Sequence, residues 1–407
     1  ENGFYENTPL YEIGFWNLLQ HYLSSEAFQF IHDALSLESV LGNWSAAEAI
    51  PWFTADFASS ELFMVPDGMQ ELIKRLHESV VEAGERFQLH LGKKVTKCRY
   101  DAQAWQVYTG PKKEPVHVYF DALILALPKA ALEQLCIKDR ETAWRPSWLS
   151  EVQPHVLYKL FLLYEQEWWM GDEEPGYSVG RTFTDLPVRQ VYYFSPKWMK
   201  ASGRCASAPG LRKVAGTNGA TAHWSLVMAS YSDEHYVDFW RPFSGEKENV
   251  PYYKAPSKVE GSRAEFLRKV EQIPEELRAG ERIVKKVQQQ LQEIHGHIIP
   301  EPVLGLYKDW GLPPFGAGWH TWNVGSKPWT YRPAAEQENV TDLYICGEAF
   351  SAEQGWIEGA LKTVENVLIS MGVPEMKYEH GWGVPDLHDY VGAPKEDKPC
   401  DPQIVNL

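Results

Sequence analysis

The sequence has no apolar run of 18 residues or more and no paired-cysteine motif. Without such a run no segment is expected to cross a bilayer, and no signal-peptide pattern is present. The cysteines are scattered without CxxC spacing, at Cys98, Cys136, Cys205, Cys346 and Cys400. This spacing excludes the common zinc sites and a disulfide-rich scaffold, and it leaves the cellular compartment open.

Positive charge is also scarce. Lys and Arg number 39 against 55 Asp and Glu, which gives a formal net charge of −16. A protein that binds nucleic acid needs a basic surface for the phosphates, so we expect no general nucleic-acid partner. What the chain does have is length and apolar content. Its 407 residues, 44% of them apolar, suffice for two packed domains with hydrophobic cores.

A buried strand is predicted close to the carboxyl end of the chain, at Leu343–Cys346. Gly347 follows it and gives a sharp exit at the strand's carboxyl end, where open α/β sheets bind their ligands. Glu348 would then lie in the crevice at this end of the strand, where its carboxylate can accept hydrogen bonds from the hydroxyl groups of a ribose or ribitol. The alternative is an ordinary strand-helix unit with a chance glutamate.

Helical periodicity begins at Gly355 and continues to residue 368. The amides of Gly355, Trp356 and Ile357 are therefore expected at the amino terminus of a helix. Such an end is electropositive and favours electron-rich groups. Together with Glu348, it predicts a site for a nucleotide-like cofactor.

The stretch GEAFSAEQGWIEGA resembles the carboxyl-terminal flavin motif of the flavin amine oxidases, and QGWIEGA is similar to the L-amino-acid oxidase branch. In that family the glutamate of the Gly-Glu pair holds the ribitol of FAD, and amides after the Gly-Trp pair approach the flavin's pyrimidine edge. The resemblance implies FAD as cofactor, with Gly347 and Glu348 at the ribitol and Trp356 and Ile357 at the pyrimidine edge. Gly355 and Trp356 would also line the place of the substrate amino group.

An earlier stretch is similar to the middle of the flavin amine oxidases. A Gly-Met turn, a helix, a strand with a Lys-Val pair and a strand ending in Pro128 follow one another in the family's order. By this resemblance the backbone of Val95 meets the adenine of FAD, and the alternative is plain core packing. Residues 122–127 are the best candidate for a parallel strand. The helix after the Gly-Met turn is expected to pack inward through Leu72, Ile73, Leu76 and Val80.

Four further residues receive roles from the resemblance. Lys159 lies in an apolar strand and resembles the lysine that holds a water near flavin N5; a buried lysine needs a partner or a lowered pKa. Its alternative is a strand lysine that faces solvent. Tyr231 resembles the tyrosine that binds the substrate carboxylate, while Trp310 and Trp319 resemble aromatic walls in front of the flavin. Packing is the alternative for these three, and His320 is expected to be structural.

A GxGxxG strand-turn-helix, which binds the FAD pyrophosphate in this family, is absent from the sequence. The nearest candidate, Gly316-Ala317-Gly318, has Thr321 in place of the third glycine. In the family this fingerprint precedes the point that corresponds to Glu1. We therefore expect a second polypeptide, cut from the same precursor, to supply this loop and the arginine for the substrate carboxylate, as part of a dimer of heterodimers.

These features predict a mixed α/β fold that combines an FAD-binding, Rossmann-like half with a substrate domain of mixed sheet and helices. The expected divisions are a helical region at 1–58, FAD-binding parts at 59–130 and 331–375, a substrate domain at 131–330 and an irregular tail at 376–407.

The resemblance implies the large subunit of an FAD-dependent L-amino-acid oxidase, with Lys159 as its catalytic residue. Such an enzyme converts an L-amino acid and dioxygen to a 2-oxo acid, ammonia and hydrogen peroxide. Three alternatives stay open: an oxidase of amines without a carboxylate, an L-amino-acid 2-monooxygenase, and a non-catalytic binding or scaffold subunit. The side chain of the substrate is not predicted, because residues of the second polypeptide would also contact it.

Overall fold

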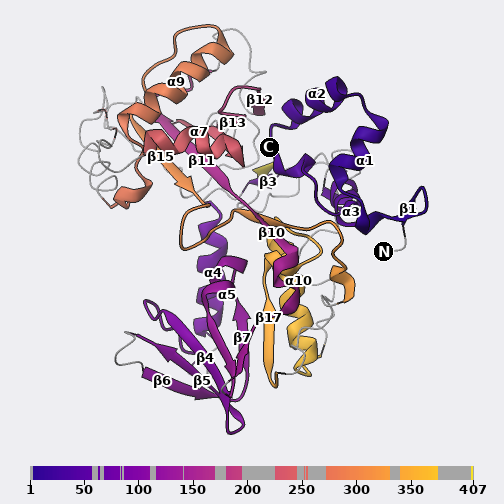
Figure 1. Ribbon diagram of the computed structural model, residues 1–407. Coiled ribbons are helices and arrows are strands. Elements are labelled where there is room, and N and C mark those ends of the chain that lie inside the picture. The colour runs from indigo at the N-terminus through magenta and orange to yellow at the C-terminus, as the bar shows by residue number, and fades with distance from the viewer. Residues whose placement is uncertain are drawn as a thin grey trace, which may run out of the picture.

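The computed structural model shows a mixed α/β chain (Figure 1). It describes residues 3–56, 63–64, 68–82, 84, 87–110, 116–140, 142–169, 180–194, 225–244, 252, 254, 272–330, 340–374 and 405–406. The predicted tail at 376–407 therefore lies outside the described residues, except for β18 (Val405–Asn406), which pairs with β3 (Phe63–Met64).

The amino-terminal region is helical. It contains β1 (Phe4–Tyr5), β2 (Thr8–Pro9), η1 (Leu10–Glu12), α1 (Phe15–Tyr22), α2 (Ser25–Leu35), η2 (Ser39–Leu41) and α3 (Ala46–Asp56). The hydroxyl oxygen of Ser24 accepts the N–H of Ala27 at 3.1 Å, which caps α2 where the sequence changes from loop to helix. Aromatic side chains fill the core of this region and meet Trp319 from the far end of the chain.

The upper region in Figure 1 is an antiparallel sheet of order β12-β13-β14-β11-β15. Its strands are β12 (Gly180–Phe183), β13 (Gln190–Phe194), β14 (Ser225–Asp233), β11 (Leu157–Tyr164) and β15 (Leu304–Asp309). Along β11 the side chains alternate, with Tyr158, Leu160, Leu162 and Tyr164 buried. This face packs in one core with residues of α7 (His235–Ser244) and α9 (Glu281–His295), so Lys159 belongs to the other, more open face.

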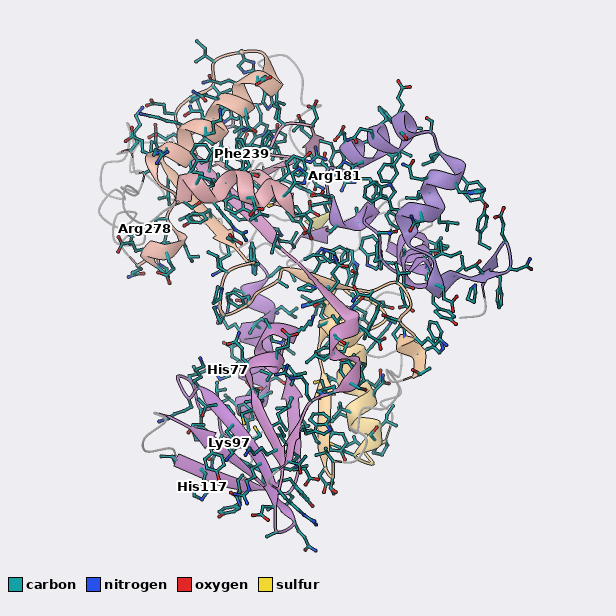
Figure 2. All side chains as sticks on the ribbon, in the orientation of Figure 1. His77, Lys97, His117, Arg181, Phe239 and Arg278 are labelled. Atoms are coloured by element: carbon teal, nitrogen blue, oxygen red, sulfur yellow. The ribbon has the colours of Figure 1, made fainter. Side chains whose placement is uncertain are left out.

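The lower region holds a second sheet of order β6-β5-β4-β8-β9. Its strands are β6 (Val116–Phe120), β5 (Ala104–Thr109), β4 (Val95–Asp101), β8 (Cys136–Asp139) and β9 (Thr142–Trp144), beside α4 (Gln70–Glu82) and α5 (Lys129–Gln134). Figure 2 marks this region by His77, Lys97 and His117, and the upper region by Phe239 and Arg278. The apolar face of α4 is exposed rather than packed inward, so the predicted inner face of Leu72, Ile73, Leu76 and Val80 has no cover among the described residues.

A parallel pair of strands lies beside this sheet. β7 (Leu123–Ala126) pairs with β17 (Leu343–Cys346) in the register Leu123 to Leu343, which confirms the predicted parallel strand at 122–127. α10 (Ile357–Ser370) follows β17 through η8 (Glu348–Phe350). The pair and its helix therefore present the carboxyl end of β17 toward the strands that join the two regions.

Those joining strands are β10 (Val152–His155) and β16 (Trp319–Trp322), which pair with His155 opposite Trp319. β10 follows η3 (Ser147–Glu151) and runs almost directly into β11, while η6 (Glu275–Leu277) and η7 (Pro328–Thr330) complete the described elements. Among the described residues, none of the helices is long and apolar enough to cross a membrane.

Candidate functional site

Gly347, directly after β17, connects the end of this strand to α10 by a hydrogen bond. Gly347 has a φ of 141°, a conformation that side chains disfavour, and its N–H donates to Oγ1 of Thr363 in α10 at 2.9 Å. The chain therefore turns sharply at the carboxyl end of the strand. Glu348 follows at once and is held close to the start of the helix, which begins at Ile357, two residues later than the sequence pattern indicated.

Three donors converge on the Glu348 carboxylate. Oε1 accepts the N–H of Gly355 at 2.6 Å and the N–H of His320 at 3.1 Å. Oε2 lies 2.8 Å from Nδ1 of His320. A carboxylate offers about four acceptor positions, so the described residues leave one for a ligand hydroxyl, and the side chain is 24% exposed. The Gly355 amide is thus committed to Glu348 instead of pointing out of the helix end.

Gly355 fits a narrow space above Trp319. Its φ is +89°, and a Cβ added to it would lie 3.0 Å from Cε3 of Trp319. Trp356 and Ile357, the residues predicted at the pyrimidine edge, follow it and are exposed. The turn therefore offers an open surface on one side and rests on an indole ring on the other.

Trp319 supports the turn from beneath. It is only 6% exposed, and its Nε1–H donates to Oγ of Ser39 at 3.1 Å. The rings of Trp44, Trp52 and His155 surround it at centroid distances of 6.2, 5.7 and 5.1 Å. Its predicted role as a substrate wall stays a prediction, and its described position is that of a packed support.

A second cluster lies on the open face of the upper sheet. Lys159 and Tyr231 are paired across β11 and β14, and Nζ of Lys159 lies 4.4 Å from the Tyr231 ring centroid and 5.9 Å from that of Trp310. All three are half-buried, and no described carboxylate forms an ion pair with Lys159.

Burial shifts both ionisable groups of this cluster toward neutrality. It lowers the pKa of Lys159 and raises the pKa of Tyr231. The phenol of Tyr231 therefore remains a neutral donor, and the ammonium of Lys159 gives up its proton more readily than an exposed lysine does. The phenol of Tyr231 can therefore donate a hydrogen bond to a carboxylate, and the amine of Lys159 can bind an ordered water.

One continuous stretch of chain joins the two clusters. The ring of His155 in β10 lies against that of Trp319 with the two planes tilted by 33°, and Lys159 follows four residues later in β11, about 13 Å along an extended strand. The carbonyl of Leu157, between them, accepts the N–H of Trp310 at 2.9 Å. Val95 belongs to neither cluster: it is exposed and begins β4 in the lower sheet.

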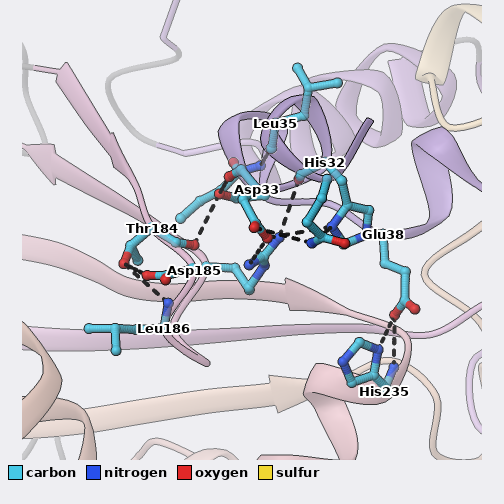
Figure 3. Close-up of polar contacts among 12 residues, drawn as sticks. His32, Asp33, Leu35, Glu38, Thr184, Asp185, Leu186 and His235 are labelled. Carbon is cyan, nitrogen blue, oxygen red and sulfur yellow. Dashed lines mark hydrogen bonds and ion pairs between the residues drawn. The ribbon is translucent and has the colours of Figure 1, made fainter. Parts of the chain in front are cut away.

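A buried arginine that the sequence reasoning missed fixes the helical region to the sheet. Arg189 is fully buried; its guanidinium lies 3.2 Å from Oδ1 of Asp33 and donates to the carbonyl of His32 at 3.3 Å. Figure 3 shows His32 and Asp33 of α2 facing the connection between β12 and β13, where Thr184, Asp185 and Leu186 are labelled. Asp33 and Arg189 are 156 positions apart, so no local pattern indicates the pair.

A second buried acid, Asp233, lies at the end of β14. Its carboxylate accepts the N–H groups of Glu38 and Ser39 at 2.8 and 2.7 Å, and also the Ser39 hydroxyl. Ser39 in turn accepts from Trp319. This chain of hydrogen bonds links the strand that carries Tyr231 to the support beneath Gly355.

The residues around Glu348 fit a hydroxylated cofactor better than a metal ion. Nε2 of His320 is buried and has no hydrogen-bond partner among the described residues, which also leave one acceptor position of the Glu348 carboxylate open, and Gly355 keeps the space above Trp319 clear of a side chain. Within the described ranges, no group of three or more His, Cys, Asp or Glu could hold a metal.

Comparisons with known proteins identify relatives of the chain. The chain is 23% identical to Aplysianin-A of Aplysia kurodai over 88% of this chain and 61% of that protein, so it spans less than two thirds of this relative. It is 27% identical to an L-amino-acid oxidase of Bungarus fasciatus over 32% of this chain and 24% of that protein.

The fold is also found in solved structures. Putrescine oxidase bound to putrescine matches with a TM-score of 0.54 and 15% identity, over 89% of this chain and 68% of the oxidase. The model of the flavin containing amine oxidoreductases matches residues 4–242 and 268–366. The predicted mixed α/β fold is confirmed, and the chain belongs to the flavin containing amine oxidoreductase family.

Proposed function

We propose that the chain forms the larger part of an FAD-dependent L-amino-acid oxidase. The carrying observation is the contact between Lys159 and Tyr231, with Nζ 4.4 Å from the ring centroid on the open face of the sheet. A lysine whose pKa burial lowers, without an acidic partner among the described residues, is costly to keep for packing alone. A neutral phenol beside it suits an amino acid carboxylate.

The chain's own residues would bind and orient. When bound, FAD supplies the acceptor for the hydride that leaves the substrate's Cα. Glu348 would accept a ribitol hydroxyl, and the exposed turn at Gly355 and Trp356 would face the amine. Tyr231 would donate to the carboxylate, while Lys159 would hold a water and exchange a proton with it at Nζ.

The proposal includes a second polypeptide that carries a GxGxxG loop. Purely parallel sheets occur almost only where both faces are covered, and β7 and β17 form a two-stranded parallel sheet that pairs with no other described strand. The apolar faces of α4 and part of α10 are exposed nearby, at Leu72, Ile73, Leu76, Leu361 and Val364. A strand-helix unit placed there would complete a Rossmann-like half, and two such pairs of chains would form the dimer of heterodimers.

A second candidate function is the oxidation of an amine that lacks a carboxylate. Arg189, which forms a β-bridge with Tyr231, is fully buried and engaged with Asp33, so it is not available to bind a carboxylate. Tyr231 would then be a wall of the amine pocket. A monooxygenase would use the same substrate contacts and differ in its product.

Intact-mass analysis and an absorbance spectrum of natively purified protein test the proposal. A second polypeptide, together with flavin bands at roughly 380 and 450 nm, is expected. Peroxide formed from L-amino acids but not from the matching decarboxylated amines would support the oxidase, whereas an amide product would indicate a monooxygenase. A colourless protein isolated with all its partners would contradict the flavin assignment and favour a scaffold role.

A further inference from the structure

We propose that His320 is a positioning residue, which fixes the Glu348 carboxylate for a hydroxyl-bearing ligand. The inference rests on the proposed function, in which that ligand is the ribitol of FAD. His320 was expected to be structural from the sequence, where it stands alone beside a Gly-rich turn.

Two of the three donors on Glu348 come from His320. Its main-chain N–H reaches Oε1 at 3.1 Å, and Nδ1 lies 2.8 Å from Oε2. One residue therefore contacts both oxygens and sets the plane of the carboxylate. His320 lies in β16, where pairing with Pro154 of β10 fixes its main chain, and its 3% exposure leaves the ring enclosed by neighbouring residues.

The other ring nitrogen separates His320 from an ordinary packed histidine. Nε2 of His320 is buried and has no partner among the described residues. By contrast, the neighbouring His155 uses both nitrogens, with Glu234 at 2.5 Å and Thr321 at 2.7 Å. A buried polar atom without a partner is costly, so packing alone would favour a side chain that lacks it.

The bond to Glu348 offsets that cost. Donation from Nδ1 fixes the imidazole tautomer and orients the carboxylate in advance, so that a ligand does not have to order it on binding. Glu348 keeps one acceptor position, and it is the more exposed of the two partners, at 24% against 4% of the side chain. The ligand is therefore expected to reach Glu348, with His320 behind it.

Three substitutions test the role in the assembled, flavin-binding protein. His320→Asn places an amide donor near the position of Nδ1, His320→Gln places it near Nε2, and His320→Leu removes it. We expect the Leu and Gln variants to bind FAD about 10- to 100-fold more weakly, the loss typical of a hydrogen bond to a charged group, and the Asn variant to stay within about threefold. FAD affinity is measured by flavin fluorescence titration.

His295→Leu is the matched control, because it removes a histidine that hydrogen-bonds Tyr193 at 2.7 Å in the upper region. It should change stability without changing FAD affinity. A double-mutant cycle with Glu348→Gln gives the second readout: His320→Leu should have little further effect once the carboxylate is gone.

The outcomes separate this inference from the proposed function. Equal weakening by His320→Leu in both Glu348 backgrounds, or equal FAD affinity in all His320 variants, would overturn the positioning role. If the Leu variant does not fold, the comparison of Asn with Gln decides, and equal affinities would again count against it. A wild-type protein that binds no FAD contradicts the proposed function itself.

Discussion

At the scale of single residues, Lys159 shows how the sheet prepares a charged group for chemistry. The alternation of β11 places it on the open face, yet the surrounding rings of Tyr231 and Trp310 desolvate it enough to lower its pKa. The same rings attract the ammonium through their π faces, which offsets part of that cost. The protein thus retains a lysine whose pKa burial lowers, so that it releases its proton more readily than an exposed lysine does.

Replacing Lys159 with Met should stabilise the protein at neutral pH, by about 1.4 kcal/mol for each unit by which the pKa is lowered. Because the unfolded chain binds this proton more tightly than the folded one, wild-type stability rises between the lowered pKa and the ordinary value near 10.5. The advantage of Lys159→Met should therefore shrink as the pH rises through that window. Urea unfolding at several pH values measures the difference in free energy of unfolding between Lys159→Met and the wild type. A difference that does not change with pH would contradict the burial of the charge.

Replacing Gly355 with Ala should weaken both folding and cofactor binding. The positive φ of +89° costs about 1 kcal/mol for a residue with a Cβ, and the contact of 3.0 Å with Trp319 adds to it. Gly372→Ala is the matched control, because Gly372 has a φ of +81° and open space around it. Thermal unfolding should show destabilisation of both variants, larger in Gly355→Ala, and titration with FAD should show a loss of affinity in Gly355→Ala alone.

At the scale of elements, α2 is attached to the upper sheet by charge and not only by apolar packing. Asp33 and His32 contact the buried Arg189, and Glu38 beyond the helix pairs with His235 at the start of α7 (Figure 3). The guanidinium also lies 4.3 Å from the ring centroid of Tyr236. Removing the Asp33 carboxylate would leave the buried guanidinium of Arg189 without a countercharge, and an unpaired buried charge strongly destabilises a fold.

Asp33→Asn should accordingly destabilise the protein by about 3 kcal/mol. Burial raises the pKa of Asp33, but hydrogen bonds from Gln29 and Arg189 outweigh it, so the net pKa is lowered. Since the folded-state pKa is depressed, the ionised Asp33 carboxylate stabilises the folded protein above about pH 4. This stabilisation is lost as the pH falls below that value. Denaturant unfolding should show the gap to wild type closing in acid.

Asp238→Asn is the control for that experiment, since Asp238 pairs with Arg241 on the surface. It should change stability by less than about 0.5 kcal/mol. A loss of similar size in the two variants would contradict the account of a buried pair.

Sequence patterns predict local structure well and long-range contacts poorly. The apolar run of β17 and the periodicity of α10 are local signals, and both elements form close to where the residues indicate. The link from His320 to Glu348 and the pair of Asp33 with Arg189 join distant segments, and no periodicity reports them. The face of α4 shows the other limit, because a pattern indicates that a face is apolar but not what covers it.

At the scale of the whole molecule, apolar side chains gather on exposed faces of α4 and α10, the helices near the parallel pair of strands. Several exposed apolar residues on one helix face need an explanation that scattered single residues do not. The proposed completing chain would bury it and supply further strands. Folding of the described chain and association with a partner are then separate properties that substitutions can distinguish.

Leu76→Glu should block association with the completing chain while it changes the stability of this chain by less than about 0.5 kcal/mol, because Leu76 is 52% exposed. Ile298→Glu, at a site 88% exposed beyond the end of α9, is the control and should leave association intact. Sedimentation of the co-expressed chains measures the association of each of the two variants with the completing chain. Normal association of the Leu76 variant would contradict the proposed docking face.

The parallel pair also has a consequence for synthesis. β7 ends at Ala126, and its partner β17 begins at Leu343, so residues 127–342 must leave the ribosome before the two strands can meet. At common rates of translation this delay is about 10–40 s. During that time the upper sheet can fold by itself, whereas the edge of β7 stays open to other nascent chains, and a chaperone that shields it would raise the yield of folded protein.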